Sequence, residues 1–322
     1  MAKKIAANRL IKTADDLITS REQTQAGFIA MALEKNYIAV PYIEEAKALK
    51  ALAKKVRKPI DLLREQDLRV GLLTASGLSD KSLNYLTEED KSLAIKGLIE
   101  KFLEPAGENF IDELVYRYLL IKGDALGGKA RNLAGTLGER KFLRTLLSVM
   151  NLAGIPYKWR DSETRSWIDK NEDDTDIEKR MNALQWSKKG KSRLLVMNIS
   201  VPTVKKNVDL SIIDGDVSDL KKGKDSIIYQ ADKFIALGEL KGGIDPAGAD
   251  EHWKTANSAL IRIRNSFSTL NFNPKTFFIG AAIEKSMANE MFAELQTGVL
   301  SNAANLTNDE QLTEICNWVT NL

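Results

Sequence analysis

The spacing of apolar residues differs between the two parts of the chain. Before about residue 150, apolar residues recur every three or four positions, as in Ile95, Leu98 and Ile99, which is the period of an amphipathic helix. Beyond it, short apolar runs of strand length alternate with helical patterns. These runs cover residues 193–200, 207–213, 233–241 and 276–283, with a helical pattern at 251–267. The sequence therefore predicts an α/β fold with at least one crossover helix, preceded by a helical part.

We place a domain boundary at residue 122. The pattern predicts a mainly helical domain over residues 1–122 and an α/β domain over residues 123–322. Residues 123–128 (Gly-Asp-Ala-Leu-Gly-Gly) are predicted to form a turn because of their glycines. This turn is expected to lead into a helix that begins near residue 129 and ends near residue 150.

Polar stretches and capping sequences mark further boundaries. Residues 160–192 and 214–230 are rich in polar residues and are interpreted as surface excursions from the sheet. Three segments have the form of a capping box, in which a threonine is followed three residues later by an acid at the start of a helix. They are Thr13–Asp16, Thr87–Asp90 and Thr307–Glu310.

The charge and the metal-binding residue types limit the possible chemistry. The 47 basic and 44 acidic residues give a net charge of +3, so any surface for nucleic acid must be local. The single cysteine, Cys316, excludes an intrachain disulfide, and the single histidine, His252, excludes a zinc site built from several imidazoles. A catalytic metal is therefore expected on carboxylates.

Neither a membrane nor a nucleotide cofactor is indicated. No apolar run approaches ~18 residues, and the first residues lack the apolar segment of a signal peptide. The motif GxxxxGK[ST] is absent, and no GxGxxG follows a strand. We expect an intracellular, cytoplasmic protein.

The segment with the clearest chemistry is the apolar run that ends in Glu239-Leu-Lys241. In a strand, residues two apart share a face, so Glu239 and Lys241 are predicted to lie side by side. Gly242 and Gly243 follow and would let another backbone come close. A surface ion pair is the alternative interpretation, because this triplet is common in proteins.

A second acid strengthens the first interpretation. Asp209 lies in an apolar strand pattern, on the opposite face from Val208 and Leu210. An acid in such a place must be paired, hydrogen-bonded or bound to metal. Strand pairing would bring Asp209 beside Glu239.

Two neighbouring carboxylates suit Mg²⁺, which takes oxygen ligands and keeps several waters. An ion on Asp209 and Glu239 would activate water for attack on a phosphodiester, with Lys241 stabilising the transition state. Asp214 and Asp216 are rivals to Asp209, but they fall in the turn after the strand.

Further candidates lie near helix starts. His252 follows Lys241 by eleven residues, and an imidazole there could accept a proton from the attacking water, although a structural role is equally expected. Lys129, Arg131 and Lys254 lie near predicted helix N-termini, where anions bind, and are candidate phosphate contacts or surface charges.

Three segments resemble the AvaI/BsoBI group of type II restriction endonucleases. They are Glu239–Ala256, Gly123–Asn132 and Val204–Asp209, and the likeness extends from residue 26 to residue 306. The resemblance implies a restriction-endonuclease-like mixed sheet flanked by helices, of the PD-(D/E)xK nuclease superfamily, joined to an N-terminal helical domain. It also implies a homodimer that encircles double-stranded DNA. The implied target is the degenerate palindrome CYCGRG, cut after the first C to leave four-base 5′ overhangs.

The resemblance also assigns roles to single residues. Asp209, Glu239 and Lys241 match the catalytic acids and lysine, and His252 matches a histidine near the attacking water. Lys206, Asp245 and Lys81 match family positions that are expected to contact the edges of DNA bases. Lysine can donate to guanine, and aspartate can accept from cytosine N4. The chain departs from the family pattern at residue 208, where valine stands in place of the proline that gives the motif its name.

Two alternatives keep part of this interpretation. The same core would serve a repair or recombination nuclease that reads DNA structure. In a DNA-binding protein without catalysis, Glu239 and Lys241 would be an inert ion pair.

Overall fold

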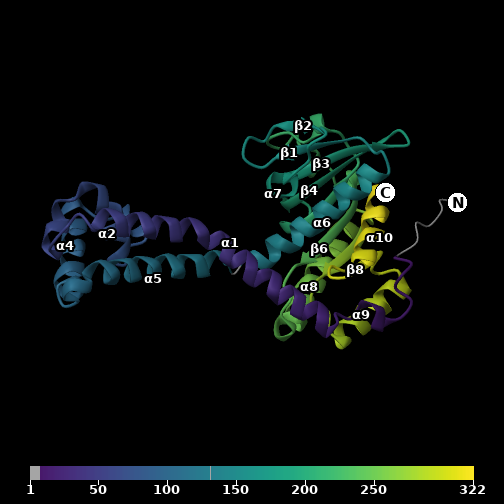
Figure 1. Cartoon of the computed structure of the whole chain (residues 1–322). Coiled ribbons are helices and arrows are strands. Elements are labelled where there is room, and N and C mark those ends of the chain that lie inside the picture. Colours follow the sequence, from purple (N-terminus) through teal and green to yellow (C-terminus); the bar gives the residue numbers. More distant parts are fainter. Residues whose placement is uncertain (1–7, 131) are drawn as a thin grey trace. The chain divides into compact units, whose positions relative to one another are not determined.

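The computed structural model describes residues 8–130 and 132–322. Within these residues the strands form an eight-stranded sheet in the order β2-β1-β3-β4-β5-β6-β7-β8 (Figure 1). Neighbours from β2 to β6 are antiparallel, whereas β6, β7 and β8 run parallel. The predicted α/β class, with a mixed sheet flanked by helices, is therefore confirmed. The strands are β1 (Tyr157–Asp161), β2 (Trp167–Asp169), β3 (Met181–Lys188), β4 (Lys191–Val201), β5 (Lys206–Ile213), β6 (Phe234–Lys241), β7 (Lys275–Gly280) and β8 (Asn302–Asn305).

The α-helices are α1 (Arg21–Ala53), α2 (Arg69–Ala75), α3 (Asp80–Leu83), α4 (Glu88–Leu98), α5 (Phe110–Ala130), α6 (Leu133–Leu152), α7 (Ile177–Arg180), α8 (Ala249–Ser268), α9 (Lys285–Thr297) and α10 (Asp309–Thr320). The predicted crossover helix is α8, which joins the parallel strands β6 and β7. No helix among the described residues is long and apolar enough to span a membrane.

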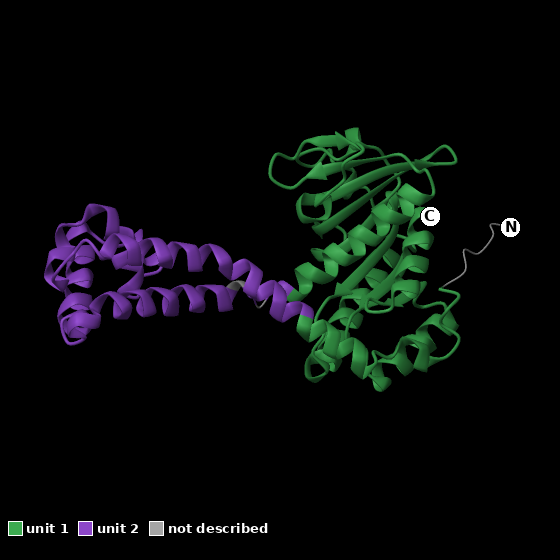
Figure 2. Ribbon diagram, in the orientation of Figure 1, with its two compact units in different colours: residues 1–29, 134–322 green, residues 30–133 purple. Residues whose placement is uncertain are grey.

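By its contacts the chain divides into two compact units (Figure 2). One unit contains residues 1–29 and 134–322, and the other contains residues 30–133. The boundary expected at residue 122 remains a prediction about domain organisation. The long helix α1 begins in the first unit and ends in the second.

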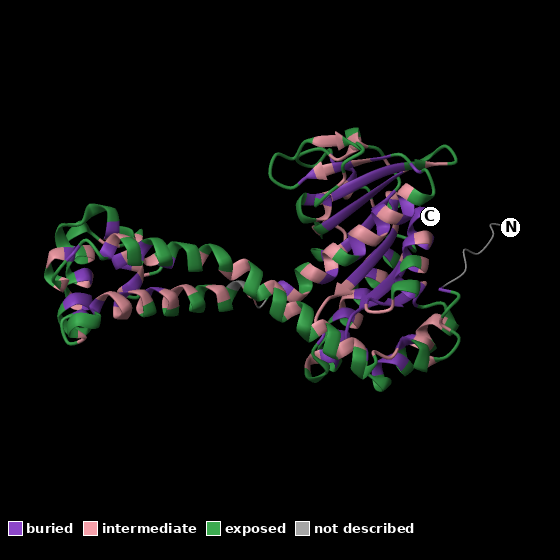
Figure 3. Cartoon of the chain, viewed as in Figure 1, coloured by how far each residue is buried: buried purple, intermediate pink, exposed green. Residues whose placement is uncertain are grey.

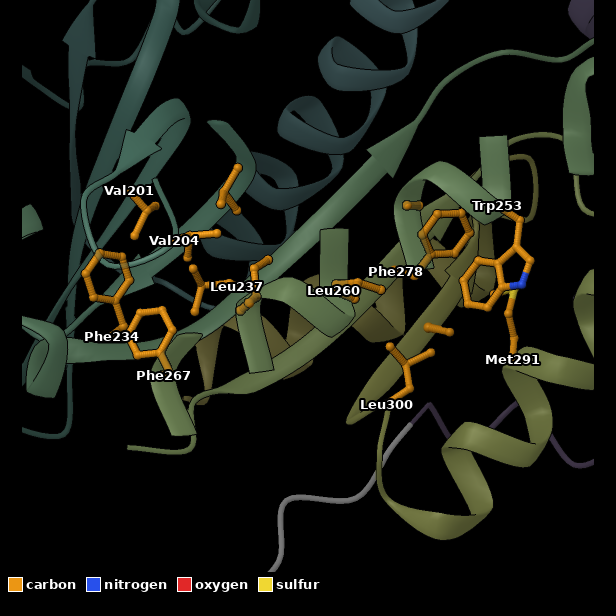
Figure 4. Packing of buried hydrophobic residues seen from close by; sticks show 14 of the residues in the cluster. Val201, Val204, Phe234, Leu237, Trp253, Leu260, Phe267, Phe278, Met291 and Leu300 are labelled. Atoms are coloured by element: carbon orange, nitrogen blue, oxygen red, sulfur yellow. The ribbon is translucent and has the colours of Figure 1, made fainter. Parts of the chain in front are cut away.

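Helices cover both faces of the sheet, whose central strands are buried (Figure 3). On one face, Trp253 and Leu260 of α8 pack with Leu237 of β6 and Phe278 of β7 (Figure 4). The apolar positions of α8 recur at helical spacing, which directs this face toward the sheet. On the other face, Trp318 of α10 makes an edge-to-face contact with Phe277 at 5.4 Å between ring centroids.

The second unit has a core of its own, formed by helices α1, α2, α4 and α5. Leu49, Leu72, Ile95 and Leu114 are among its buried residues. Helix α4 begins at the capping box predicted at Thr87–Asp90, where each residue's side chain bonds the other's backbone.

Three local predictions are wrong. Residues 123–128 belong to α5, which continues through their glycines, and none of these glycines has the positive φ that many tight turns use. Residues 160–192 contain β2 and β3, since Ala183, Leu184 and Trp186 are buried on the two faces of β3 and only the flanking turns are polar. Helix α10 is capped by Asn308, because Thr307 bonds Asn305 instead.

Candidate active site

Strand β6 brings Glu239 and Lys241 to one face of the sheet, as their spacing predicts. The Lys241 Nζ donates a hydrogen bond to Glu239 Oε2 at 2.8 Å. Gly238 faces the other way, where a Cβ would collide with the ring of Phe277 at 2.4 Å. The Glu239 side chain is 5% exposed, and that of Lys241 is 22% exposed. The pair therefore lies at the boundary between the protein interior and solvent.

Asp209 meets this pair from β5. The last paired residues of β5 and β6 are Leu210 and Gly238, so Asp209 lies one position beyond them, where the two strands separate. Its Oδ2 accepts hydrogen bonds from the backbone N–H of Leu240 at 2.9 Å and from Lys241 Nζ at 3.0 Å. One ammonium group thus bridges two carboxylates from neighbouring strands, and the predicted meeting of the three side chains is confirmed.

Burial and the neighbouring charges shift the pKa values of both Glu239 and Lys241. Burial, followed by the nearby charge of Asp209, raises the pKa of Glu239 to about 7. Burial works against the charged form of Lys241, but Glu239 and Asp209 outweigh it and raise the pKa of the ammonium group. Lys241 therefore stays charged at neutral pH, while Glu239 is poised to gain or lose a proton.

The glycines after Lys241 allow close packing, as the sequence suggests. A Cβ at Gly242 would lie 2.2 Å from the carbonyl oxygen of Ala134, in the first turn of α6. A Cβ at Gly138, one turn further, would lie 2.7 Å from the Cα of Gly242. These contacts fix the N-terminal part of α6 against the end of β6, next to the cluster.

His252 lies near the cluster as the fourth residue of α8, at the end of its first turn. Its Nε2 would be 3.0 Å from a Cβ at Gly243 and 3.3 Å from one at Gly248. The residue is exposed. The imidazole is therefore open to solvent beside the residue that lies two positions after Lys241, and its catalytic role stays a prediction.

The cluster is suited to a hydrated divalent ion rather than to an ion enclosed by protein. Among residues 8–130 and 132–322, no group of three histidine, cysteine or acidic side chains could hold an ion by itself. Asp209 and Glu239 nevertheless offer carboxylate oxygens on adjacent strands, and Mg²⁺ is usually bound by one or two carboxylates together with water. The residues present fit such an ion.

The rivals of Asp209 have other partners. Asp214 accepts a hydrogen bond from Arg193, and the Asp216 side chain accepts one from the backbone N–H of Val217 at 2.6 Å. Their positions in the turn after β5 agree with the preference for Asp209.

Three of the candidate DNA-contacting residues lie on the surface of the sheet-containing unit and differ in their partners. Lys206 is exposed at the start of β5, three residues before Asp209. Asp245 is exposed and caps a short helical turn by accepting a hydrogen bond from the N–H of Ala247 at 3.0 Å. Lys254, on the surface of α8, forms an ion pair with Asp250.

The remaining candidates lie in or beside the unit formed by residues 30–133. Lys81 is exposed on α3. Lys129 is near the C-terminal end of α5 rather than at a helix start, because α5 continues through the predicted turn. The prediction for Arg131 lies outside the described residues.

Sequence reasoning missed one acidic residue near the cluster. Glu139 of α6 accepts a hydrogen bond from Asn198 Nδ2 of β4 at 3.0 Å. Burial, together with the charge of Asp209, raises the pKa of Glu139. No motif marks Glu139, which is 70 positions before Asp209, so only the packing of α6 on the sheet identifies it.

Comparison with known proteins assigns the chain to a family. A model of the family described as restriction endonuclease BsobI matches residues 7–322. The chain belongs to the BsobI restriction endonuclease family. The type II restriction enzyme AvaI of Nostoc sp. is 51% identical over 308 residues, which cover 96% of this chain and 97% of AvaI. The type II restriction enzyme BsoBI of Geobacillus stearothermophilus is 53% identical over 315 residues, 97% of each chain.

Membership of the BsobI family confirms the activity predicted from the sequence. The enzyme is a type II restriction endonuclease, that is, a site-specific deoxyribonuclease. Enzymes of this class act on double-stranded DNA and in general require a divalent metal ion. The repair nuclease and the non-catalytic DNA-binding protein considered as alternatives are thereby set aside.

Proposed function

We propose that the enzyme hydrolyses phosphodiester bonds of double-stranded DNA at a site formed by Asp209, Glu239 and Lys241, with Mg²⁺ held by the two carboxylates. The observation that carries this proposal is the single ammonium group of Lys241, which lies within 3.0 Å of both acids. One compact ammonium group cannot by itself compensate two carboxylates when one of them, Glu239, is deeply buried. The second carboxylate provides the additional negative charge that a divalent cation offsets.

The roles of the side chains follow from their positions. Asp209 and Glu239 hold the ion at the point where β5 and β6 separate and solvent has access. When bound, the ion lowers the pKa of water and neutralises charge that develops on the phosphate. Lys241 contributes a fixed positive charge beside the scissile phosphate, where it stabilises the transition state more than the ground state. The exposed imidazole of His252 accepts the proton of the attacking water.

Target recognition is proposed to follow the family resemblance. The enzyme cleaves CYCGRG after the first C and leaves four-base 5′ overhangs. It acts as a homodimer, because each chain carries one such cluster whereas a palindromic duplex has two strands to be cut. Base edges are contacted by Lys206, Asp245 and Lys81, and phosphates by Lys129, Arg131 and Lys254. The cell compartment is the prokaryotic cytoplasm.

Plasmid digestion with and without Mg²⁺ tests the site and its target together. Wild-type enzyme should give discrete fragments whose ends map to CYCGRG, and Asp209→Asn and Glu239→Gln should lower cleavage by at least about 10³-fold. Both variants should still bind a duplex that contains the target. Cleavage by Glu239→Gln at the wild-type rate would falsify the assignment, whereas ends at another sequence would overturn the target alone.

A further inference from the structure

The active-site cluster has a third acidic neighbour, Glu139, which lies outside the sequence segments that contain Asp209, Glu239 and Lys241. Glu139 projects from the part of α6 that is fixed against the end of β6. Its neighbour Gly138 has no room for a Cβ because the Cα of Gly242, directly after Lys241, would be 2.7 Å away. This packing of α6 therefore brings Glu139 near the end of β6, where Lys241 lies.

A second contact locates Glu139 from the side of Asp209. Asn198, which donates to Glu139 at 3.0 Å, lies between Met197 and Ile199, which pair with Leu210 and Val208. The position opposite Asn198 in this antiparallel register is therefore Asp209. Directly opposite residues in such a pair are about 5 Å apart. The charge of Asp209 also reaches Glu139, because it adds to the effect of burial on the pKa of that carboxyl group.

The backbone of Asn198 has an uncommon conformation at the residue that contacts Glu139. Its φ of 52° lies in the left-handed region, which interrupts the regular path of β4. A non-glycine residue there is uncommon, although asparagine tolerates it better than most. This conformation directs the amide toward α6, where it holds the Glu139 carboxylate.

We propose that Glu139 is an outer carboxylate of the metal site, which acts on the ion through water, and that Asn198 positions it. This inference rests on the metal assignment proposed above for Asp209 and Glu239. Glu139 does not complete a set of three direct protein ligands with them. A hydrated Mg²⁺ presents water hydrogens to surrounding acceptors, so a carboxylate beyond direct reach still contributes to affinity.

Mn²⁺ binding to the DNA-free enzyme tests this role without relying on activity. Mn²⁺ prefers the same oxygen ligands, and its free form is quantified by electron paramagnetic resonance. Glu139→Gln keeps an acceptor for Asn198 but removes the charge, and should weaken binding by about tenfold or more. Glu163→Gln, the same change at an exposed turn, is the matched control and should bind as wild type.

Asn198→Gly provides a second test that depends less on the fold, because glycine adopts the left-handed backbone without strain. It should weaken Mn²⁺ binding several-fold. The double variant Asn198→Gly/Glu139→Gln should bind no more weakly than Glu139→Gln alone, since Asn198 acts through Glu139. Additive losses would overturn the positioning role.

Asp209→Asn separates failure of this inference from failure of the proposed function. It should lose Mn²⁺ binding in the same titration. If it does, but both Glu139→Gln and Asn198→Gly bind as wild type, the outer carboxylate is disproved and the proposed site stands. If Asp209→Asn itself binds as wild type, the metal assignment is wrong, and the role of Glu139 is wrong with it.

Discussion

Two clusters in the sheet-containing unit each hold one basic side chain between two carboxylates, yet they differ in how well the charges are compensated. In the first, Arg144 of α6 lies 3.1 Å from Asp174 Oδ1 and also bonds Glu178. Asp174 receives a further hydrogen bond from Asn151 Nδ2 at 2.8 Å. The planar guanidinium, with its five donors, suits such a double pairing.

The second cluster is less well compensated. Lys241 offers one compact ammonium group to Asp209 and Glu239, and Glu239 is more deeply buried than Glu178, with side-chain exposures of 5% and 14%. Burial and Asp209 together raise the pKa of Glu239 to about 7. Similar sets of charged side chains therefore have different roles in the two clusters. The arginine cluster stabilises the fold, whereas the lysine cluster retains unfavourable negative charge that a cation can offset.

Removal of the two basic side chains should separate these roles most strongly. Lys241→Met should reduce DNA cleavage by about 10²- to 10³-fold, because transition-state stabilisation by a preorganised charge is lost. Arg144→Met should leave the cleavage rate within a few-fold of wild type and instead lower stability by about 1 to 2 kcal/mol. Single-turnover cleavage at saturating Mg²⁺, with thermal unfolding of the same samples, measures both effects. Similar rate losses in the two variants would remove the distinction between the clusters.

Neutralisation of the two glutamates should have opposite effects on stability. In metal-free protein at pH 8, Glu239→Gln should raise Tm by a few degrees, because it removes a poorly compensated buried charge and keeps an acceptor for Lys241. Glu178→Gln should lower Tm by a similar amount, because Arg144 loses its charged partner. Differential scanning fluorimetry in EDTA checks the signs, and a decrease for both variants would contradict the interpretation of the lysine cluster.

The central part of the site could be predicted from the sequence because it depends on short-range periodicity. Glu239 and Lys241 are two residues apart in an apolar strand, and Asp209 is an isolated acid in a neighbouring strand pattern. The spacing determines a shared face, and the cost of burying a lone charge predicts a partner. Both arguments need only local sequence and adjacent strands.

The parts that could not be predicted depend on packing between distant segments. The sequence around β3 predicts a surface excursion because its apolar residues are flanked by polar turns, and only the pairing of β3 with β1 and β4 places it in the sheet. The glycines at 127 and 128 suggested a turn, but the helix α5 around them overrides that local preference. Glu139 comes near Asp209 only because α6 packs against Gly242, and no spacing along the chain records that contact.

The last expected effect is a change in how stability depends on pH, and it tests the origin of the charge imbalance. The pKa of Glu239 is about 7 in the folded protein and near the ordinary value of 4.5 when unfolded. Between these values the folded state retains a proton that the unfolded state has released, so the stability of metal-free enzyme should fall as pH rises from 4.5 to about 7. The contribution of Glu239 is at most about 3 kcal/mol, since each pKa unit corresponds to about 1.4 kcal/mol.

Two comparisons isolate this contribution from other titrating groups. In Glu239→Gln the part of this fall in stability that Glu239 causes should be absent. The Tm of the variant should therefore exceed that of wild type by an amount that grows between pH 5 and pH 7 and is constant above pH 8. The stability of Glu178→Gln should fall with rising pH as that of wild type does. Saturating Mn²⁺ should remove the decline in wild-type enzyme, because a cation on Asp209 and Glu239 favours the ionised carboxylate. A difference between wild type and Glu239→Gln that does not change with pH would show that burial of Glu239 carries no protonation cost, and the lysine cluster would then be a structural ion pair like that of Arg144.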